Sequence, residues 1–324
     1  MTRSFARAAG WLALPLLLLG AAGIQAQGYP ERPVRIIVGF APGGSSDIVA
    51  RLMAQHLTPL LGQPVVVENK PGAGGMLASD AVAKAAPDGY ALLLATAGHP
   101  VMAAIVRKLP FEPLKDFSWI STITTYPFVI ATSPQSRFKS LADVISAAKA
   151  APGTISYSSV GIGTAHHLLG EWFSTETGIE LIHVPFKGGS ATITEVLAGR
   201  IDIMFETITA TMAHIKSGKL RPLAVTTREP TSFLAGVPTV AQTVPGLVFQ
   251  SWLGIAAPPA LPAAVTERLV RDLHRVLGEP EAQKRLAELG GAAAPIRPDA
   301  MRAQVESEIG RWRQLVESRH IERQ

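Results

Sequence analysis

One unit recurs along this chain and constrains its fold more than any other feature: a short apolar segment, a glycine-containing loop, and a segment with helical spacing of apolar residues. The apolar segments are Val34–Phe40, Val65–Val67, Ile155–Ser159 and Leu181–Val184, and the loops after them span 42–47, 70–75, 161–164 and 185–190. Alternating strands and helices of this kind predict a parallel sheet with helices on both faces. We therefore expect an α/β fold.

The four loops share a chemistry suited to anions. Glycine lets backbone N–H groups turn toward a ligand, and the helix N-terminus that follows adds partial positive charge and N–H groups without intrahelical partners. Together they form a favourable anion site. Since two loops lie in each half of the chain, we expect a cleft that holds an anion from both sides.

The same alternation extends to the C-terminus. Helices are expected at Ile48–Leu61, Met76–Ala86, 141–150, Ala165–Thr177, Ser190–Ala198, Ile208–Ser217, Pro262–Leu277, Pro280–Leu289 and Pro298–Ser318. Further strands are expected at Tyr90–Thr96, Phe128–Thr132, Ile201–Phe205, Leu220–Thr226 and Phe249–Ala256.

A chain of about 300 residues is longer than one core usually organises, so we expect two lobes. We interpret 128–132 as a crossing to the second lobe and 249–256 as the return. Residues 27–127 and 250–324 are thus assigned to lobe 1, and residues 128–249 to lobe 2. Two crossings imply a two-strand hinge, as in receptors that close on a ligand.

The N-terminus has the pattern of an export signal. Arg3 and Arg7 precede the apolar run Trp11–Gly23, and Ile24-Gln25-Ala26 offers a cleavage site. The run is short for a membrane span, so we assign residues 1–26 to a signal peptide, the alternative being an uncleaved anchor. The chain has no cysteine, which excludes disulfides and a lipid-anchored N-terminal cysteine. We expect a protein that is exported to the periplasm and soluble after cleavage.

Charge and motifs exclude several classes of function. Removing Arg3 and Arg7 from the 30 basic residues leaves 28 against 25 acidic residues, scattered along the chain, which argues against nucleic-acid binding. The chain has no Gly-x-Ser-x-Gly nucleophile motif and no cysteine nucleophile. Lys187-Gly188-Gly189-Ser190 has the wrong order for a phosphate loop, and Gly161-Ile162-Gly163 lacks the third glycine of a dinucleotide fingerprint. We expect no catalysis and no cofactor.

Individual residues in the loops have structural as well as functional interpretations. Gly43, Gly44 and Ser45 suit a tight turn with a helix cap as well as a ligand loop. Asp47 is expected to be structural, because a carboxylate facing an anionic ligand would repel it. Adjacent His166 and His167 point in different directions on a helix, so we expect no metal site there, but packing or a hydrogen bond near the cleft.

A series of motifs, in order along nearly the whole mature chain, resembles one known family. They are FAPGGSSDIVAR at 40–51, VVVENKPGAGG at 65–75, APDGY at 86–90, KDF at 115–117, GTAHHL at 163–168, HVPFKG at 183–188, HIKSGKLR at 214–221 and VPTV at 237–240. Together they are similar to the Bug-type substrate-binding receptors of tripartite tricarboxylate transporters.

The resemblance implies a two-lobed, type II periplasmic-binding-protein fold with a ligand cleft between the lobes. It implies a small carboxylate held mainly by backbone amides and ordered water, with contacts from the loops 42–47, 72–75, 161–166 and 187–191. The predicted ligand-binding residues are Pro42, Gly43, Gly44, Ser45, Ser46, Gly74, Gly75, Gly161, Gly163, Thr164, His166, Lys187, Gly188, Ala191 and Glu206. For Lys187, pairing with a surface acid and raising the positive potential at the cleft mouth remain open.

Two departures from the family pattern bear on ligand identity. Glu206-Thr207 stands where members often have Asp-Asn, and Gly75-Met76-Leu77-Ala78 stands where members often have Gly-Asn-Ile-Gly. Glu206 follows an apolar strand, where α/β folds place ligand contacts. It is expected either to favour ligands with a hydrogen-bond donor, directly or through a water, or to cap the helix beginning near Ile208.

The sequence thus predicts a monomeric periplasmic receptor that binds a small organic carboxylate and delivers it to the membrane permease of a tripartite transporter. Two alternatives stay open. One is a receptor that reports to a two-component sensor kinase. The other is a secreted α/β enzyme acting on a carboxylate.

Overall fold

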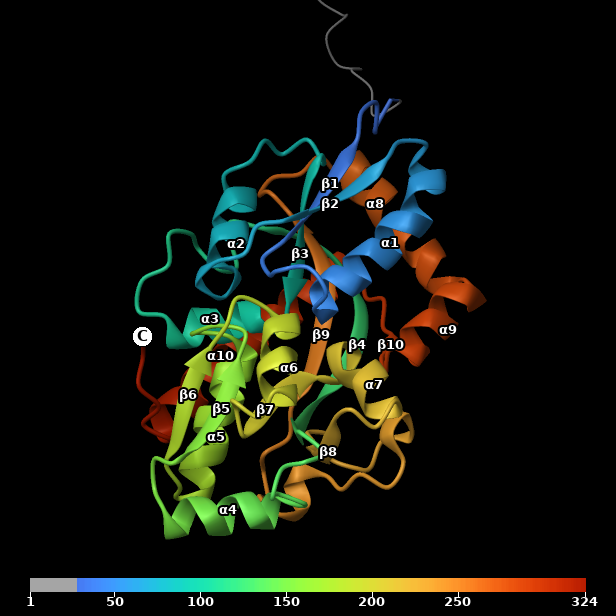
Figure 1. The fold of residues 1–324 in the computed structure, drawn as a ribbon. Coiled ribbons are helices and arrows are strands. Elements are labelled where there is room, and N and C mark those ends of the chain that lie inside the picture. The colour runs from blue at the N-terminus through green and yellow to red at the C-terminus, as the bar shows by residue number, and fades with distance from the viewer. Residues whose placement is uncertain (1–27) are drawn as a thin grey trace, which may run out of the picture.

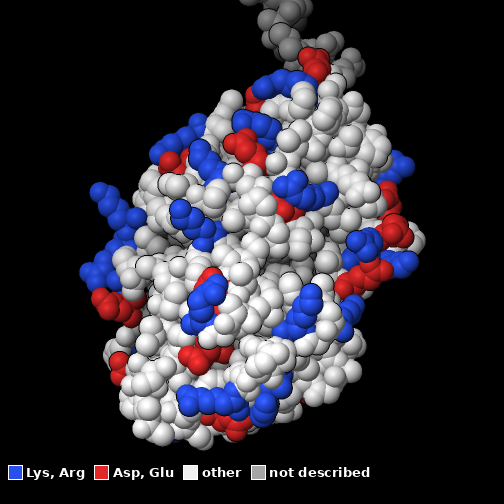
Figure 2. Space-filling view, viewed as in Figure 1, with Lys and Arg blue, Asp and Glu red and all other residues white. Residues whose placement is uncertain are grey.

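The computed structural model describes residues 28–324 (Figure 1). The signal peptide assigned to residues 1–26 lies outside the described residues. No helix between residues 28 and 324 is long and apolar enough to cross a membrane. Basic and acidic side chains are interspersed over the face in Figure 2, without an extended patch of one sign.

Lobe 1, at the top of Figure 1, is built on three parallel strands. β1 (Val34–Val38) lies between β2 (Val65–Asn69) and β3 (Ala91–Thr96). Helix α1 (Ser45–Leu61) follows β1, and α2 (Met76–Ala83) follows β2. Each of these helices begins just beyond the carboxyl end of a strand, which directs its N-terminus toward the same edge of the sheet.

Lobe 2 repeats the arrangement. β5 (Ile155–Ser159) pairs in parallel with β6 (Leu181–Pro185) and β7 (Ile203–Thr207). The helices of this lobe are α4 (Leu141–Ala150), α5 (Ala165–Thr177), α6 (Gly189–Leu197) and α7 (Ile208–Lys216). Helix α4 begins with a capping box, in which Ser140 and Asp143 satisfy each other's backbone N–H groups.

Two antiparallel strands run between the lobes. β4 (Ser118–Thr132) pairs with β9 (Gln250–Ala257) as far as Pro127, and from Phe128 it pairs with β7 and with β8 (Arg221–Val225). The sheet order is β2-β1-β3-β9-β4-β7-β5-β6, with β8 and the short β10 (Ala292–Ala293) also on β4. The lobe boundaries at 127/128 and 249/250 remain a prediction, which this change of partners supports.

Three helices follow β9, and their assignment to lobe 1 remains a prediction. They are α8 (Ala263–Gly278), α9 (Pro280–Glu288) and α10 (Pro298–Ser318). Helix α8 packs on α1, and α10 packs on β4 and on α3 (Gly98–Ile105), a helix that the sequence analysis missed. The first half of β4 was also missed, and because β4 and β9 are antiparallel the sheet is mixed rather than wholly parallel. The expected α/β class is correct.

Candidate functional site

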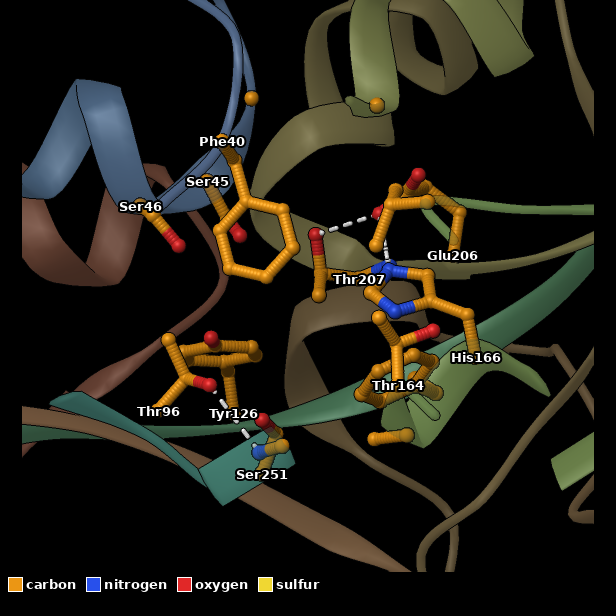
Figure 3. Close-up of a pocket in the computed structure, with 16 residues that line it drawn as sticks. Phe40, Ser45, Ser46, Thr96, Tyr126, Thr164, His166, Glu206, Thr207 and Ser251 are labelled. Carbon is orange, nitrogen blue, oxygen red and sulfur yellow. Dashed lines mark hydrogen bonds and ion pairs between the residues drawn. The ribbon is translucent and has the colours of Figure 1, made fainter. Parts of the chain in front are cut away.

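A pocket lies between the lobes, beside the two crossing strands (Figure 3). It contains about 460 Å³ of space when its open mouth is included. Its lining residues are Phe40, Gly44, Ser45, Ser46, Thr96, Gly98, Tyr126, Phe128, Val160, Thr164, Ala165, His166, Gly189, Glu206, Thr207 and Ser251.

The N-termini of several helices converge on this pocket. First-turn residues of α1, α3, α5 and α6 line it, and so does Thr207, which caps α7. Gly44 and Gly188, the residues before α1 and α6, provide no side-chain cap. First-turn N–H groups have no intrahelical acceptor and lie at the positive end of the helix dipole. The pocket therefore presents backbone donors to an anion from both lobes.

The side chains of the pocket are mostly uncharged. Phe40, Phe128 and Val160 supply apolar surface, and none of the lining residues is lysine or arginine. Burial raises the pKa of Tyr126 to about 12, although hydrogen bonds with Ser251 and Ser45 act in the opposite direction, so its phenol is neutral near neutral pH. The lining of the pocket therefore offers dipoles and hydroxyl groups but no lysine or arginine side chain.

Glu206 and His166 are hydrogen-bonded to each other in the wall of the pocket. His166 Nε2 lies 2.9 Å from Glu206 Oε1, which also accepts from Thr207 N at 2.8 Å and from Thr207 Oγ1 at 3.0 Å. Glu206 Oε2 accepts from Thr192 Oγ1 at 3.1 Å. Burial opposes ionisation of Glu206, but His166 and these donors outweigh it and hold the pKa of the carboxyl below its usual value. Glu206 is therefore ionised at neutral pH.

The structure corrects one interpretation of Glu206. The cap of α7 is Thr207, whose hydroxyl accepts from Ala210 N. Glu206 instead lies near the starts of three helices, since it contacts His166 in the first turn of α5, Thr207 before α7 and Thr192 near the start of α6. Its carboxylate is a built-in anion of lobe 2.

Asp47, in the first turn of α1, is absent from the pocket lining. Its carboxylate accepts from Gly43 N (3.0 Å), Arg51 Nε (3.0 Å) and Asn69 Nδ2 (3.0 Å). Burial alone would raise the pKa of Asp47, but Arg51 and the other donors lower it. Asp47 thus fixes the loop before α1.

The predicted ligand-binding residues fall into groups. Those that line the pocket are Gly44, Ser45, Ser46, Thr164, His166 and Glu206. Gly74, Gly161 and Lys187 line a second cavity where the loops of the two lobes meet, and Gly74 and Gly75 line a third beneath Phe40. The remaining predicted residues do not line the pocket of Figure 3; they are Pro42, Gly43, Gly163, Gly188 and Ala191. As ligand contacts, all of these residues remain predictions.

The loops outside the pocket bring the lobes together. Ala41 N donates to Lys187 O at 3.1 Å, and Ser190 Oγ donates to Pro42 O at 3.1 Å. A Cβ atom at Gly74 would lie 2.6 Å from Ile162 O in the other lobe. The absence of a side chain at Gly74 therefore permits the close approach of the two loops. These contacts between the loops show that the lobes are closed in this structure.

Sequence reasoning missed part of the lining. The missed residues are Phe40, Thr96, Gly98, Tyr126, Phe128, Val160, Ala165, Gly189, Thr207 and Ser251. Several adjoin predicted loops, and Thr96 ends a predicted strand, a position at which α/β folds bind ligands. Tyr126 and Ser251 are partners across β4 and β9, a pairing that no local pattern indicates.

In residues 28–324, no three His, Cys, Asp or Glu side chains are grouped so that they could hold a metal ion. His166 and His167 diverge, since His167 stacks on His183 with 4.4 Å between the ring centroids while His166 reaches Glu206.

Two lobes joined by crossing strands, with an anion-type pocket between them, define the class of periplasmic solute-binding proteins. Residues 49–321 match the family model described as tripartite tricarboxylate transporter family receptor. The chain belongs to this family, so the family inferred from its motifs is correct.

Relatives agree with this assignment. The chain is 34% identical over 299 residues to Protein BugT of Bordetella pertussis, covering 91% of this chain and 92% of BugT. The structure of the periplasmic binding protein BugD superposes with a TM-score of 0.88 at 33% identity, covering 91% of this chain and all of BugD. The structure of R. palustris Rpa4515 with adipate has a TM-score of 0.87 at 32% identity and covers 90% of this chain and 98% of that protein.

Proposed function

We propose that this chain is a periplasmic receptor that binds a small organic carboxylate between its lobes and delivers it to the permease of a tripartite tricarboxylate transporter. The observation that carries the proposal is the convergence of the N-termini of α1, α3, α5 and α6 on a pocket whose lining contains no lysine or arginine. Such a pocket recognises a carboxylate through backbone N–H groups and hydroxyls. A solved relative with bound adipate supports the ligand class.

The geometry favours binding over catalysis. A histidine that acts as a general base must reach a nucleophile or a water within hydrogen-bond distance. His166 Nε2 is engaged by Glu206, and Nδ1 is buried and has no hydrogen-bond partner among residues 28–324. No hydroxyl group is thus placed for activation by His166. We infer that the chain is a receptor and not a hydrolase.

Ligand binding is tested with a panel of acids: butyrate, benzoate, succinate, malate, adipate and glutamate. A ligand that binds only the folded state raises the Tm by mass action. We expect at least one acid to raise the Tm and to give a saturable heat in calorimetric titration, while the matching neutral amide gives neither. Mass spectrometry of ligand released from protein purified from its native periplasm would identify the natural acid. If every acid fails on ligand-free protein, the proposed function is wrong.

Delivery is tested separately. The closed, acid-bound protein is expected to capture the membrane subunits of a tripartite transporter from native membranes, and the acid-free protein is expected to capture less. If the acid-bound protein captures a sensor kinase instead, it is still a receptor, but one that reports to the kinase and does not deliver its ligand to a permease. We expect a monomer, which light scattering measures directly.

A further inference from the structure

The two sides of the pocket differ in charge. Ser45, Ser46 and Thr96, which bear hydroxyl groups, lie on one side (Figure 3). Glu206 and His166 lie on the other side. The hydroxyl groups come from the first turn of α1 and the end of β3, whereas the carboxylate comes from β7. A ligand in the pocket therefore meets neutral hydrogen-bond donors on one side and an acid on the other.

Glu206 occupies the place that a bound anion would take among the helix starts of lobe 2. Its Oε1 accepts from Thr207 N at 2.8 Å, just before α7, and lies 2.9 Å from His166 Nε2 in the first turn of α5. Its Oε2 lies 3.1 Å from Thr192 Oγ1 in α6, and a Cβ atom at Gly189 would lie 2.9 Å from the same oxygen. Donors at helix N-termini hold bound carboxylates in this way, so the protein fills this position from within.

The charges of the lining leave no partner for two ligand carboxylates. Glu206 is ionised, none of the lining residues is lysine or arginine, and the phenol of Tyr126 is neutral. His166 is hydrogen-bonded to Glu206, so a neutral imidazole leaves the charge of this carboxylate in place and a protonated one only cancels it. The lining is therefore negative or neutral before a ligand enters.

Charged side chains of the neighbouring loops do not change this balance. Lys187 lines the separate cavity between the loops of the two lobes. Asp47, outside the lining, is paired with Arg51 at 2.9 Å. The hydroxyls and the N-termini of α1 and α3 can hold one carboxylate. A second one would be buried without a counter-charge in a pocket that already contains the ionised Glu206, which costs free energy.

The rest of the lining suits an uncharged group. Phe40, Phe128 and Val160 supply apolar surface, and the ring of Phe128 packs edge-on against His166 with 4.6 Å between the centroids. Burial of an apolar ligand body against these side chains is favourable, whereas burial of a second carboxylate against them is not.

We propose that the pocket selects acids with a single carboxylate and an uncharged, largely apolar body, and that Glu206 is the specificity-determining residue that excludes a second carboxylate. The inference rests on the proposed function and narrows its ligand class. Glu206 is 1% exposed, and it acts through its charge without direct contact, because a Coulomb interaction inside a protein extends beyond contact distance.

The test compares acids that differ in the group at one end. One series is butyrate, succinamate and succinate, and the other is benzoate, 4-carbamoylbenzoate and terephthalate. Calorimetric titrations at pH 8, at which both carboxyl groups of a diacid are ionised, measure the affinities. In the series whose monoacid binds, we expect the acid with a carbamoyl group to bind about tenfold more tightly than the diacid, or better. The two have nearly the same size, so this comparison isolates charge and needs no variant.

Glu206→Gln removes the charge and keeps the size of the side chain. The ratio of the two affinities is expected to decrease by about threefold or more, because a second carboxylate no longer meets an anion. Asp202→Asn is the matched control, since Asp202 immediately precedes β7, at the end opposite to Glu206, and is outside the pocket lining. Its carboxylate accepts from Ser156 N and Ser156 Oγ, both at 2.9 Å. This variant is expected to keep the wild-type ratio.

The outcomes are distinguishable. Equal affinities for the carbamoyl acid and the diacid in wild type overturn this inference while the proposed function stands, and so does a diacid of the panel that binds more tightly than both monoacids. An unchanged ratio in Glu206→Gln, or an equal decrease in Asp202→Asn, also overturns it. If Glu206→Gln does not fold, the two wild-type series decide. If no acid binds, the proposed function fails and this inference fails with it.

Discussion

At the scale of the residue, two loop glycines have different reasons to lack a side chain. Gly44 has φ −85° and ψ 173°, a conformation open to any residue, and a Cβ atom there would lie 3.5 Å from Gly189 N across the pocket. Gly163 has φ +78°, and a Cβ atom there would lie 3.0 Å from a Val106 methyl group. Bulk at Gly44 enters the pocket, whereas bulk at Gly163 strains the backbone and presses on the end of α3.

Substitution by valine is expected to separate these roles. Gly44→Val should keep a Tm close to wild type but bind the panel acid about tenfold more weakly or worse, a loss of ~1.4 kcal/mol, because its methyl groups obstruct the N–H groups of α1 and α6. Gly163→Val should instead lose about 1–3 kcal/mol of folding stability. Chemical denaturation and calorimetric titration measure both quantities. Wild-type affinity in Gly44→Val would contradict the pocket as the binding site.

At the scale of the element, the sequence predicted helices correctly where local signals, such as a capping residue or a glycine, mark both ends of the segment. The expected ranges of α5 and α10 match the structure residue for residue, because Thr164 caps α5, Gly178 ends it with φ +62°, and Pro298 occupies the first turn of α10. Helix α3 escaped prediction because His99–Ile105 is buried on all sides and contains Pro100, so it has neither an amphipathic period nor a clear start.

The candidate site also has a part that the sequence predicts and a part that it does not. Loops at the carboxyl ends of parallel strands could be predicted from glycine spacing, and six predicted residues line the pocket. The wall of the pocket formed by Tyr126 and Ser251 could not be predicted from the sequence, because these residues come together only through the pairing of β4 with β9. The contact of His166 with Glu206 likewise depends on the placement of α5 beside β7.

Helix α3 also makes the stability of the fold depend on pH. Burial among Phe111, Phe117 and Trp119 lowers the pKa of His99 to about 4, although a hydrogen bond with Pro113 O (2.7 Å) acts in the opposite direction. The unfolded chain takes up this proton near pH 6.5, so stability is full above that pH and is lost as the pH falls toward 4. The maximum loss for His99 is about 3 kcal/mol.

His99→Phe is expected to flatten this dependence. Phenylalanine is apolar and fits an aromatic surrounding, so the variant should lose less stability than wild type between pH 7 and pH 4.5. Urea denaturation at both pH values measures the difference. The control is His56→Gln, which removes a histidine that pairs with Glu279 outside the aromatic cluster around His99. Equal slopes in wild type and His99→Phe would show that His99 is not the group responsible.

At the scale of the whole molecule, closure depends on contacts between loops that belong to different lobes. Gly188 has φ 171°, so its backbone is extended and open to any residue, but a Cβ atom there would lie 3.0 Å from Ala41 Cβ and 3.2 Å from Ala41 N. Ala41 N is also the donor to Lys187 O across the cleft. The same glycine that precedes α6 therefore leaves room for the opposing loop when the lobes close.

Gly188→Val is expected to fold normally and to close poorly. Because its side chain occupies space that Ala41 needs in the closed form, the lobes remain apart, and the ligand loses the donors of one lobe. Small-angle scattering should show wild-type protein becoming more compact with the panel acid and the variant changing less, with affinity lowered by about tenfold or more, or ~1.4 kcal/mol. Gly278→Val, at an exposed position with nothing within 4 Å, is the matched control and should behave as wild type. Full compaction of Gly188→Val with wild-type affinity would mean that this contact does not limit closure, and that the loops around Gly188 and Ala41 can separate while the acid remains bound.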